Sequence, residues 1–172
     1  DIRSKKRVLK FIDAAKIAEP LSDVPYLVNA LGIAPGAVTI AAGPGFVGKT
    51  VTLQDMAVSI AAGLPIWGVY HAKRGPIAHL DFEQGDRISR ERYQRIARAK
   101  GLDLASLPIR LCVHPEIGLQ ERDALDVYTR SLDGTVFAIV DSLRAAASTA
   151  DENSSEVRRF IDLLNQVSER TG

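Results

Sequence analysis

Short apolar runs alternate along the chain with segments in which apolar residues recur at i, i+3, i+4 and i+7. Runs bounded by glycine or proline are typical of buried strands, and the second spacing is typical of amphipathic helices. Strands that alternate with helices predict an α/β fold, in which helices flank a mostly parallel, twisted sheet. The runs predict strands at residues 37–42, 77–82, 108–113 and 136–141, and the spacings predict helices at 51–61, 86–100, 119–132 and from 154 onward.

The N-terminal part of the chain carries no strand pattern. Residues 1–19 begin with basic side chains and continue with an amphipathic stretch, which predicts an N-terminal helix or linker. Residues 20–36 are punctuated by prolines and glycines, so we expect a segment that leads into the first strand. The chain of 172 residues is long enough for one domain with its own core. We place this domain at residues 20–172.

Composition and charge narrow the class of protein. Hydrophobic residues make up 46% and charged residues 25% of the chain, as in ordinary globular domains. The net charge of +1 gives no overall basic field to attract nucleic acid. No apolar run approaches the ~18 residues of a membrane-spanning helix. The single cysteine, Cys112, lies in an apolar run, which predicts a small core residue and a reducing, cytoplasmic location.

One octapeptide carries the strongest chemical signal, and it lies between the first predicted strand and the first long helix. It fits G-x-x-x-x-G-K-[ST], the phosphate-binding P-loop. In such a loop, backbone N–H groups and the positive end of the helix surround the phosphates of a nucleotide. We expect Lys49 to reach the outer phosphates and the Thr50 hydroxyl to bind Mg²⁺. The predicted nucleotide-binding residues are Gly43, Pro44, Gly45, Phe46, Val47, Gly48, Lys49, Thr50 and Val51.

Two other glycine-loop motifs overlap this octapeptide. Gly43, Gly45 and Gly48 also fit the dinucleotide fingerprint G-x-G-x-x-G, which needs an acid about 20 positions further on. The nearest acids at a predicted strand end are Asp81 and Glu83, which are too far along the chain. A protein-kinase loop would be accompanied by H-R-D and D-F-G sequences, and neither occurs. The P-loop interpretation is therefore retained.

Two acids follow predicted strands. Glu83 comes directly after the strand at 77–82, and Asp141 ends the strand at 136–141, which has the form of a Walker B strand. Ligands of parallel sheets bind beyond the C-terminal strand ends, so both acids are expected at the edge where the P-loop lies. We expect Asp141 to complete the Mg²⁺ shell opposite Thr50, and Glu83 to orient the attacking water. The alternative for Glu83 is an ordinary surface acid.

Other polar residues are interpreted as structural. His79 and His114 lie in or at the end of apolar strands and are expected to pack, and without paired His/Cys spacing no zinc site is expected. The helix at 86–100 is rich in arginine. This pattern admits a nucleic-acid surface, but we interpret it as a solvated face, since acids interrupt the basic run.

These motifs resemble a known family. Residues 80–84 (Leu-Asp-Phe-Glu-Gln) and 139–143 (Ile-Val-Asp-Ser-Leu), together with the order of strands and helices, look like the RecA-like core of P-loop ATPases. Within that group, residues 140–146, 151–153 and 168–172 are most similar to the RepA-like branch, which contains hexameric replicative helicases of plasmids and phages.

The resemblance implies a set of properties. ATP and Mg²⁺ are the implied cofactors, Glu83 corresponds to the glutamate that polarises the attacking water, and Lys49 is the second implied catalytic residue. The implied assembly is a homo-oligomeric ring or filament with ATP sites between subunits, and single-stranded DNA is an implied partner. In the family another strand follows a helix like the one that ends at Gly172, so we expect the domain to be truncated at its C-terminus.

Two departures from the family pattern keep alternatives open. Phe46 stands where many relatives have glycine, and residues 145–153 contain no lysine or arginine to bind nucleic-acid phosphates. The expected function is a Mg²⁺-dependent ATPase in a DNA-associated motor of the RepA helicase type. The alternative is a nucleotide-gated assembly or regulatory ATPase that does not act on DNA. A P-loop kinase would need a phosphate-acceptor pocket and lid arginines, which we do not identify.

Overall fold

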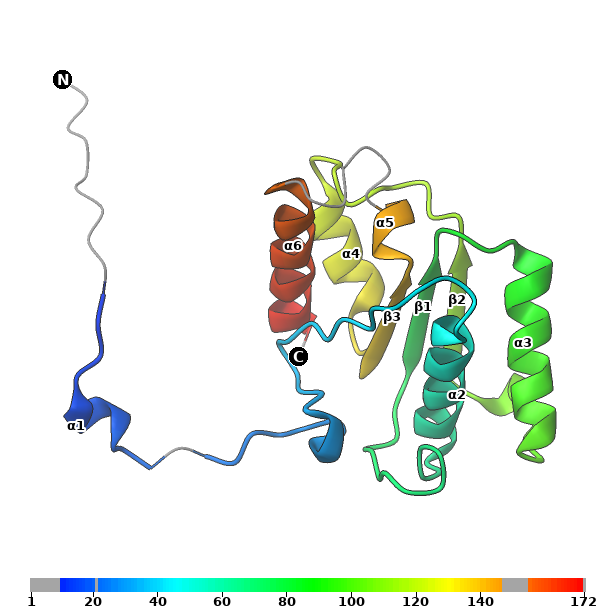
Figure 1. Cartoon of the computed structure of the whole chain (residues 1–172), viewed down its shortest axis with the longest axis horizontal. Coiled ribbons are helices and arrows are strands. Elements are labelled where there is room, and N and C mark those ends of the chain that lie inside the picture. The colour runs from blue at the N-terminus through cyan, green and yellow to red at the C-terminus, as the bar shows by residue number, and fades with distance from the viewer. Residues whose placement is uncertain (1–9, 21, 147–154, 172) are drawn as a thin grey trace.

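The fold is built on a small parallel sheet, as the alternation of strands and helices predicts. The structure is a computed structural model that describes residues 10–20, 22–146 and 155–171. Its strands are β1 (Ile77–Asp81), β2 (Ile109–Val113) and β3 (Phe137–Asp141), in the order β2-β1-β3 (Figure 1). Both pairings are parallel and in register, so Asp81 at the end of β1 lies between Val113 and Asp141. The central strand β1 is buried along its whole length.

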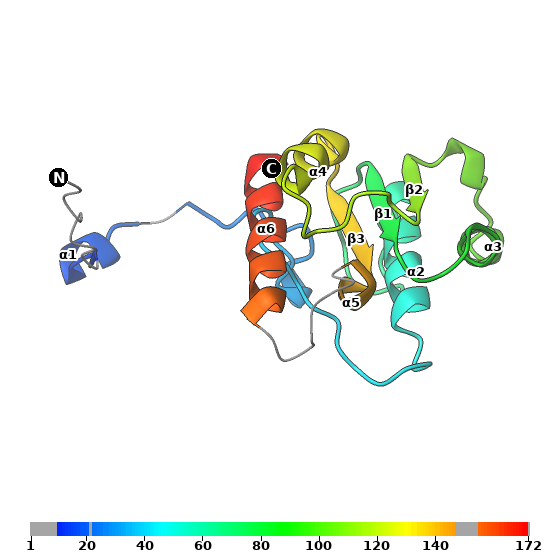
Figure 2. The ribbon, with the colours of Figure 1, turned by 90° about the horizontal axis from the view of Figure 1, so that it is seen from above.

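Helices cover both faces of this sheet, which makes the protein α/β (Figures 1 and 2). One face packs against α2 and α3, and the opposite face packs against α4 and α6. Side chains of a strand alternate between faces, so Ile77 joins the first core while Ala78 and Leu80 join the second. The helices are α1 (Ala14–Ile17), α2 (Lys49–Ala62), α3 (Asp86–Ala99), α4 (Ala124–Leu132), α5 (Leu143–Ala146) and α6 (Ser155–Thr171), with 3₁₀ turns at Asn29–Leu31 and Leu104–Ser106.

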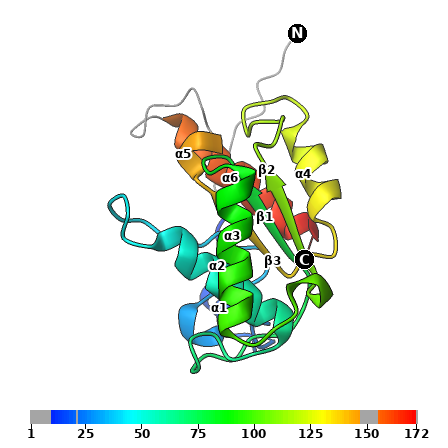
Figure 3. The ribbon, with the colours of Figure 1, turned by 90° about the vertical axis from the view of Figure 1, so that its right-hand side faces the viewer.

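Helices α2 and α3 lie side by side on the face that carries the P-loop (Figure 3). Gly63 ends α2 in a left-handed conformation with a φ of 74°, which glycine adopts without steric cost. A salt bridge of 2.9 Å joins Lys100, just after α3, to Asp55 of α2. Such a partly exposed pair contributes at most about 1 kcal/mol, so the shared apolar core carries most of the packing energy.

The strand expected at residues 37–42 is absent from the sheet, so that prediction was wrong. This segment has no regular structure, and the Ile40 side chain is 57% exposed. Its neighbourhood is instead tied to α6: the Gly36 N–H donates to Ser168 Oγ at 3.0 Å, and the Val38 N–H donates to Asn165 Oδ1 at 3.1 Å. Side chains of α6 thus accept hydrogen bonds that a neighbouring strand would otherwise take.

Cys112 is exposed rather than part of the core, which corrects a second expectation. It lies on β2, whose residues are alternately half-buried and exposed because β2 is an edge strand. On that face a cavity of about 410 Å³ lies between β2 and α4, and Arg110, Cys112 and Tyr128 help to line it. An apolar run alone does not show whether both of its faces are covered.

Smaller differences concern the ends and phases of helices. The helix expected over 119–132 begins only at Ala124, although Leu119 before it is buried. On α3 the buried positions are Ser89, Tyr93 and Ala97, whereas Ile88 is 47% exposed.

Helix α1 lies apart from the sheet (Figure 1). The helix or linker expected at residues 1–19 contains α1, which has no buried residue, while residues 1–9 lie outside the described part. Among the residues that the structure describes, no helix has the length and apolar character needed to cross a membrane.

Candidate functional site

The P-loop leads directly into α2. The loop residues are exposed, and Gly48 precedes the helix with a φ of 91°, a left-handed value that disfavours residues with a Cβ. Phe46 also has a left-handed φ of 64°, and its side chain is fully exposed. No side chain caps the N-terminus of α2. The first N–H groups of the helix are therefore open to an anion.

The Lys49 side chain folds back over the P-loop that precedes it. Its ammonium donates hydrogen bonds to the carbonyls of Gly43 at 2.8 Å and Pro44 at 2.7 Å. The two bonds keep the positive charge beside the turn in which phosphates would lie. The same ammonium can exchange these neutral acceptors for phosphate oxygens, which form stronger, charge-assisted hydrogen bonds.

Thr50 and Asp141 meet at the other side of the loop. Thr50, in the first turn of α2, donates from Oγ1 to Asp141 Oδ2 at the end of β3, at 2.6 Å. Hydroxyl and carboxylate oxygens are hard ligands that suit Mg²⁺, which typically takes one or two protein carboxylates together with phosphates and waters. No group of three or more His, Cys, Asp or Glu side chains that could hold a metal occurs among the described residues. The donor set therefore fits a Mg²⁺ ion that arrives with a nucleotide rather than a fully protein-bound metal.

Glu83 lies in the turn between β1 and α3, and its side chain is exposed. The residue before it, Phe82, donates its N–H to the carbonyl of Asp141 at 2.7 Å. This bond joins the ends of β1 and β3, so the Glu83 turn begins beside the strand that carries Asp141. The structure thus brings the turn of Glu83 and the P-loop helix to the same sheet edge.

A buried polar pair lies beneath the C-terminal ends of the strands. His79 of β1 and Tyr93 of α3 face each other, with 3.1 Å between Nδ1 and the hydroxyl oxygen. Burial lowers the pKa of His79, although the charges of Asp81 and Asp141 oppose this effect. Burial likewise raises the pKa of Tyr93. The packing role expected for His79 is confirmed, whereas His114 is exposed and the same expectation for it was wrong.

Asp81 is the functional candidate that sequence reasoning missed. Its side chain is fully buried, and its carboxylate accepts hydrogen bonds from the N–H groups of Glu83 at 3.0 Å and Gln84 at 2.7 Å. The hydroxyl of Ser89 is a third donor to it. The sequence did contain a signal for this role, because Asp81 lies near the end of a predicted strand, just before a turn. An aspartate side chain in that position often accepts hydrogen bonds from backbone N–H groups a few residues further on.

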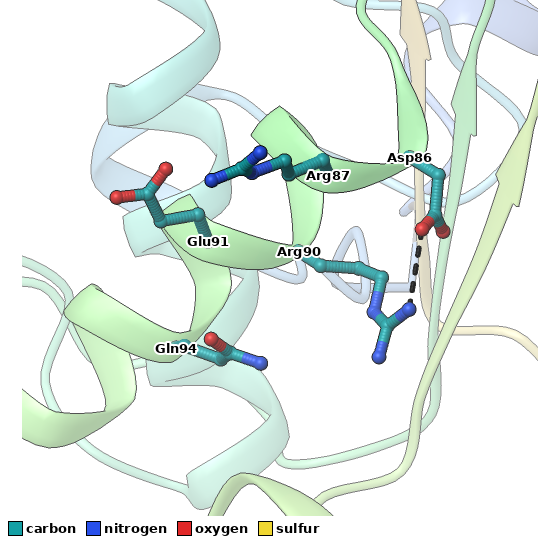
Figure 4. A pocket seen from close by; sticks show the side chains of 5 residues that line it. All are labelled: Asp86, Arg87, Arg90, Glu91 and Gln94. Atoms are coloured by element: carbon teal, nitrogen blue, oxygen red, sulfur yellow. Dashed lines mark hydrogen bonds and ion pairs between the residues drawn. The ribbon is translucent and has the colours of Figure 1, made fainter.

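The arginine-rich face of α3 carries paired charges. A shallow hollow of about 340 Å³ is lined by α3 side chains alone (Figure 4). Arg90 pairs with Asp86 at 3.2 Å, and Arg95 pairs with Glu91 at 2.8 Å, all four being largely exposed. This arrangement supports the solvated face expected from the sequence.

Comparison with known proteins settles the family. The family model of the AAA domain matches residues 4–172, which is almost the whole chain. The chain belongs to this family of P-loop ATPases. The family supports a nucleotide-binding domain. A comparison with curated proteins found no match.

Proposed function

We propose that this AAA-family domain binds ATP with Mg²⁺, hydrolyses it, and does so as part of a DNA-associated oligomeric motor of the RepA helicase type. The observation that carries the proposal is the contact of 2.6 Å between Thr50 and Asp141, which joins the P-loop helix to an acid at a strand end. A hydroxyl and a carboxylate in contact beside an uncapped helix N-terminus supply ligands for a metal-bound triphosphate.

Each residue at this edge has a definite task in the proposed reaction. The loop N–H groups and Lys49 would bind the phosphates, and Thr50 and Asp141 would hold Mg²⁺, which would supply positive charge against the transferred phosphoryl group. Glu83 would accept a hydrogen bond from the attacking water and orient it toward the outer phosphate. Val51 and the loop side chains, including Phe46, belong to the proposed nucleotide-binding residues.

The motor assignment rests on the likeness of residues 140–146 and 168–172 to the RepA-like branch. The exposed P-loop also supports an ATP site that a neighbouring subunit completes, in a ring or filament, because solvent-facing side chains such as Phe46 and Val47 are available for contact. Single-stranded DNA is the proposed partner.

A second candidate is a nucleotide-gated assembly or regulatory ATPase that does not act on DNA. The observation in its favour is the segment after Asp141, in which residues 145–153 carry no lysine or arginine. Contacts to phosphates supply most nucleic-acid affinity, and this segment offers none.

ATP turnover of the intact protein, with and without single-stranded DNA, separates the two candidates. Lys49→Ala should abolish turnover in both conditions, because this lysine is the main positive charge at the phosphates. Lys73→Ala, at an exposed lysine before β1, is the matched control and should leave turnover unchanged. Normal turnover in Lys49→Ala would contradict the site assignment.

The response to DNA then decides the role. Turnover that rises with DNA supports the motor. Lys49-dependent turnover that is indifferent to DNA, together with ATP-dependent assembly, supports the regulatory ATPase.

A further inference from the structure

We propose that Asp81 is a positioning residue, whose buried carboxylate fixes the turn that presents Glu83 to the reaction. The inference rests on the proposed function, because it assigns Asp81 a role through Glu83. Asp81 itself would touch neither nucleotide nor metal, since it is fully buried and its oxygens already accept hydrogen bonds.

The carboxylate of Asp81 connects three parts of the chain. Its Oδ1 accepts from the N–H groups of Glu83 and Gln84, at 3.0 and 2.7 Å. Its Oδ2 accepts from the hydroxyl of Ser89, which is buried in the first turns of α3. One side chain therefore ties the end of β1, the Glu83 turn and the start of α3 together.

Backbone bonds hold the residues on either side of this turn, including the Gly85 carbonyl, but the described backbone bonds do not include the N–H groups of Glu83 and Gln84. The Phe82 N–H donates to the carbonyl of Asp141 at 2.7 Å, and the His114 N–H donates to the carbonyl of Asp81 at 2.7 Å. Beyond Phe82 the sheet ladder stops. Among the described contacts, the N–H groups of Glu83 and Gln84 bond only to the Asp81 carboxylate. The Phe82 bond places the start of the turn beside Asp141, and the Asp81 carboxylate holds the N–H groups of Glu83 and Gln84 that follow it.

The buried carboxylate of Asp81 is satisfied by hydrogen-bond donors of its own neighbourhood. No lysine or arginine pairs with it among the described residues, and the next strand places Asp141 directly beside it in register. A buried carboxylate without a cation is tolerated only when several donors satisfy it, and charge-assisted bonds of this kind are about twice as strong as neutral ones. Three donors on one buried carboxylate fit a turn whose position must be fixed closely, because a displacement of about 1 Å can reduce turnover about a hundredfold.

A double-mutant cycle on the full chain tests the proposal. Asp81→Ala should lower kcat for ATP at least about tenfold, while the Kd for Mg-ATP stays within about twofold, because only the Glu83 turn moves. Asp81→Asn keeps an oxygen for the two N–H groups and should recover most of kcat. In the Glu83→Gln background, Asp81→Ala should cause no further loss, since the group through which it acts is already removed.

The control and the alternative variant keep the test decisive. Asp86→Ala removes an exposed acid five positions further along the chain and should leave kcat unchanged. If Asp81→Ala does not fold, Ser89→Ala removes only the Oδ2 donor and should lower kcat by roughly two- to fivefold without weakening nucleotide binding.

Four results would overturn the proposal. If Asp81→Ala has normal kcat, Asp81 is a structural residue only. The same conclusion follows if Asp81→Ala lowers kcat by the same factor in the wild-type and in the Glu83→Gln background. The same holds if Asp81→Ala is unfolded and Ser89→Ala has normal kcat. Normal turnover in Glu83→Gln alone would instead remove the water-orienting role of Glu83 from the proposed function, and the role of Asp81 with it.

Discussion

The turn that carries Glu83 and the loop that precedes Lys49 belong to the same site, yet the chain holds them by different means. The Glu83 turn follows a fully buried strand, and a buried carboxylate binds its N–H groups. The P-loop follows an exposed segment that is not paired in the sheet, and within the described part of the chain the Lys49 ammonium bonds to two carbonyls of its own loop.

The difference indicates how the site divides its work. The Glu83 side, which we propose orients water, is organised by contacts within the chain before any ligand arrives, as electrostatic preorganisation requires. The P-loop side, which we propose binds phosphate, leaves its donors open, so that a nucleotide would supply their partners. We therefore expect substitutions on the Glu83 side to lower kcat. We expect a bound nucleotide to change the structure and protection of the P-loop side more than those of the Glu83 side.

Among the variants on the Glu83 side, the largest effect is expected for Glu83→Gln. Without a carboxylate to orient water, kcat should fall about a hundredfold or more, whereas the Kd for Mg-ATP should remain within about twofold. Single-turnover hydrolysis and equilibrium nucleotide binding measure the two quantities. Glu91→Gln, at an exposed glutamate of α3, is the matched control. A parallel loss of binding would show that Glu83 belongs to the phosphate-binding side.

A ligand should stabilise the two sides unequally. A non-hydrolysable ATP analogue with Mg²⁺, at about 100 times its Kd, adds about 2.7 kcal/mol to the free energy of unfolding and should raise Tm by roughly 5 to 10 °C. Hydrogen exchange should slow most at residues 43–50, where N–H groups gain phosphate partners, and little at residues 77–84. Leaving out Mg²⁺ is the control. Equal slowing of both segments would contradict the proposed division.

The smallest effect is a pH dependence of stability that His79 imparts. Burial lowers the pKa of His79 from the unfolded value of 6.5, so below that pH the unfolded chain binds a proton that the folded protein excludes. The free energy of unfolding should therefore fall as the pH drops below 6.5, and this contribution should be constant above it. Thermal unfolding from pH 7.5 to 5.5, with His79→Phe and with exposed His71→Gln as control, measures it. An unchanged slope in His79→Phe would assign the dependence to another group.

The sequence was most informative where motif and periodicity agree. The runs that became β1, β2 and β3 were located almost to the residue, and the contact between Thr50 and Asp141 follows from a P-loop and a strand that ends in aspartate. Both predictions depend on local patterns and on one topological rule, that parallel strands end at a common edge.

What the sequence did not reveal depends on the neighbours of each segment. The run at 37–42 is apolar enough for a strand, but α6 side chains take the N–H groups of Gly36 and Val38. Cys112 is exposed because β2 lies at the edge of the sheet. The spacing of apolar residues predicts where a strand is, but not its place in the order of strands. The role that we propose for Asp81 is inferred from its burial and its three donors together, which the sequence does not show.

The exposure of Cys112 has a practical consequence. It is the only cysteine of the chain, and it lies on the sheet face opposite α2 and the P-loop. A thiol-reactive dye can therefore be attached at one defined position without altering a residue of the ATP site. Energy transfer between donor- and acceptor-labelled copies would then report, in real time, whether nucleotide brings copies of the chain together.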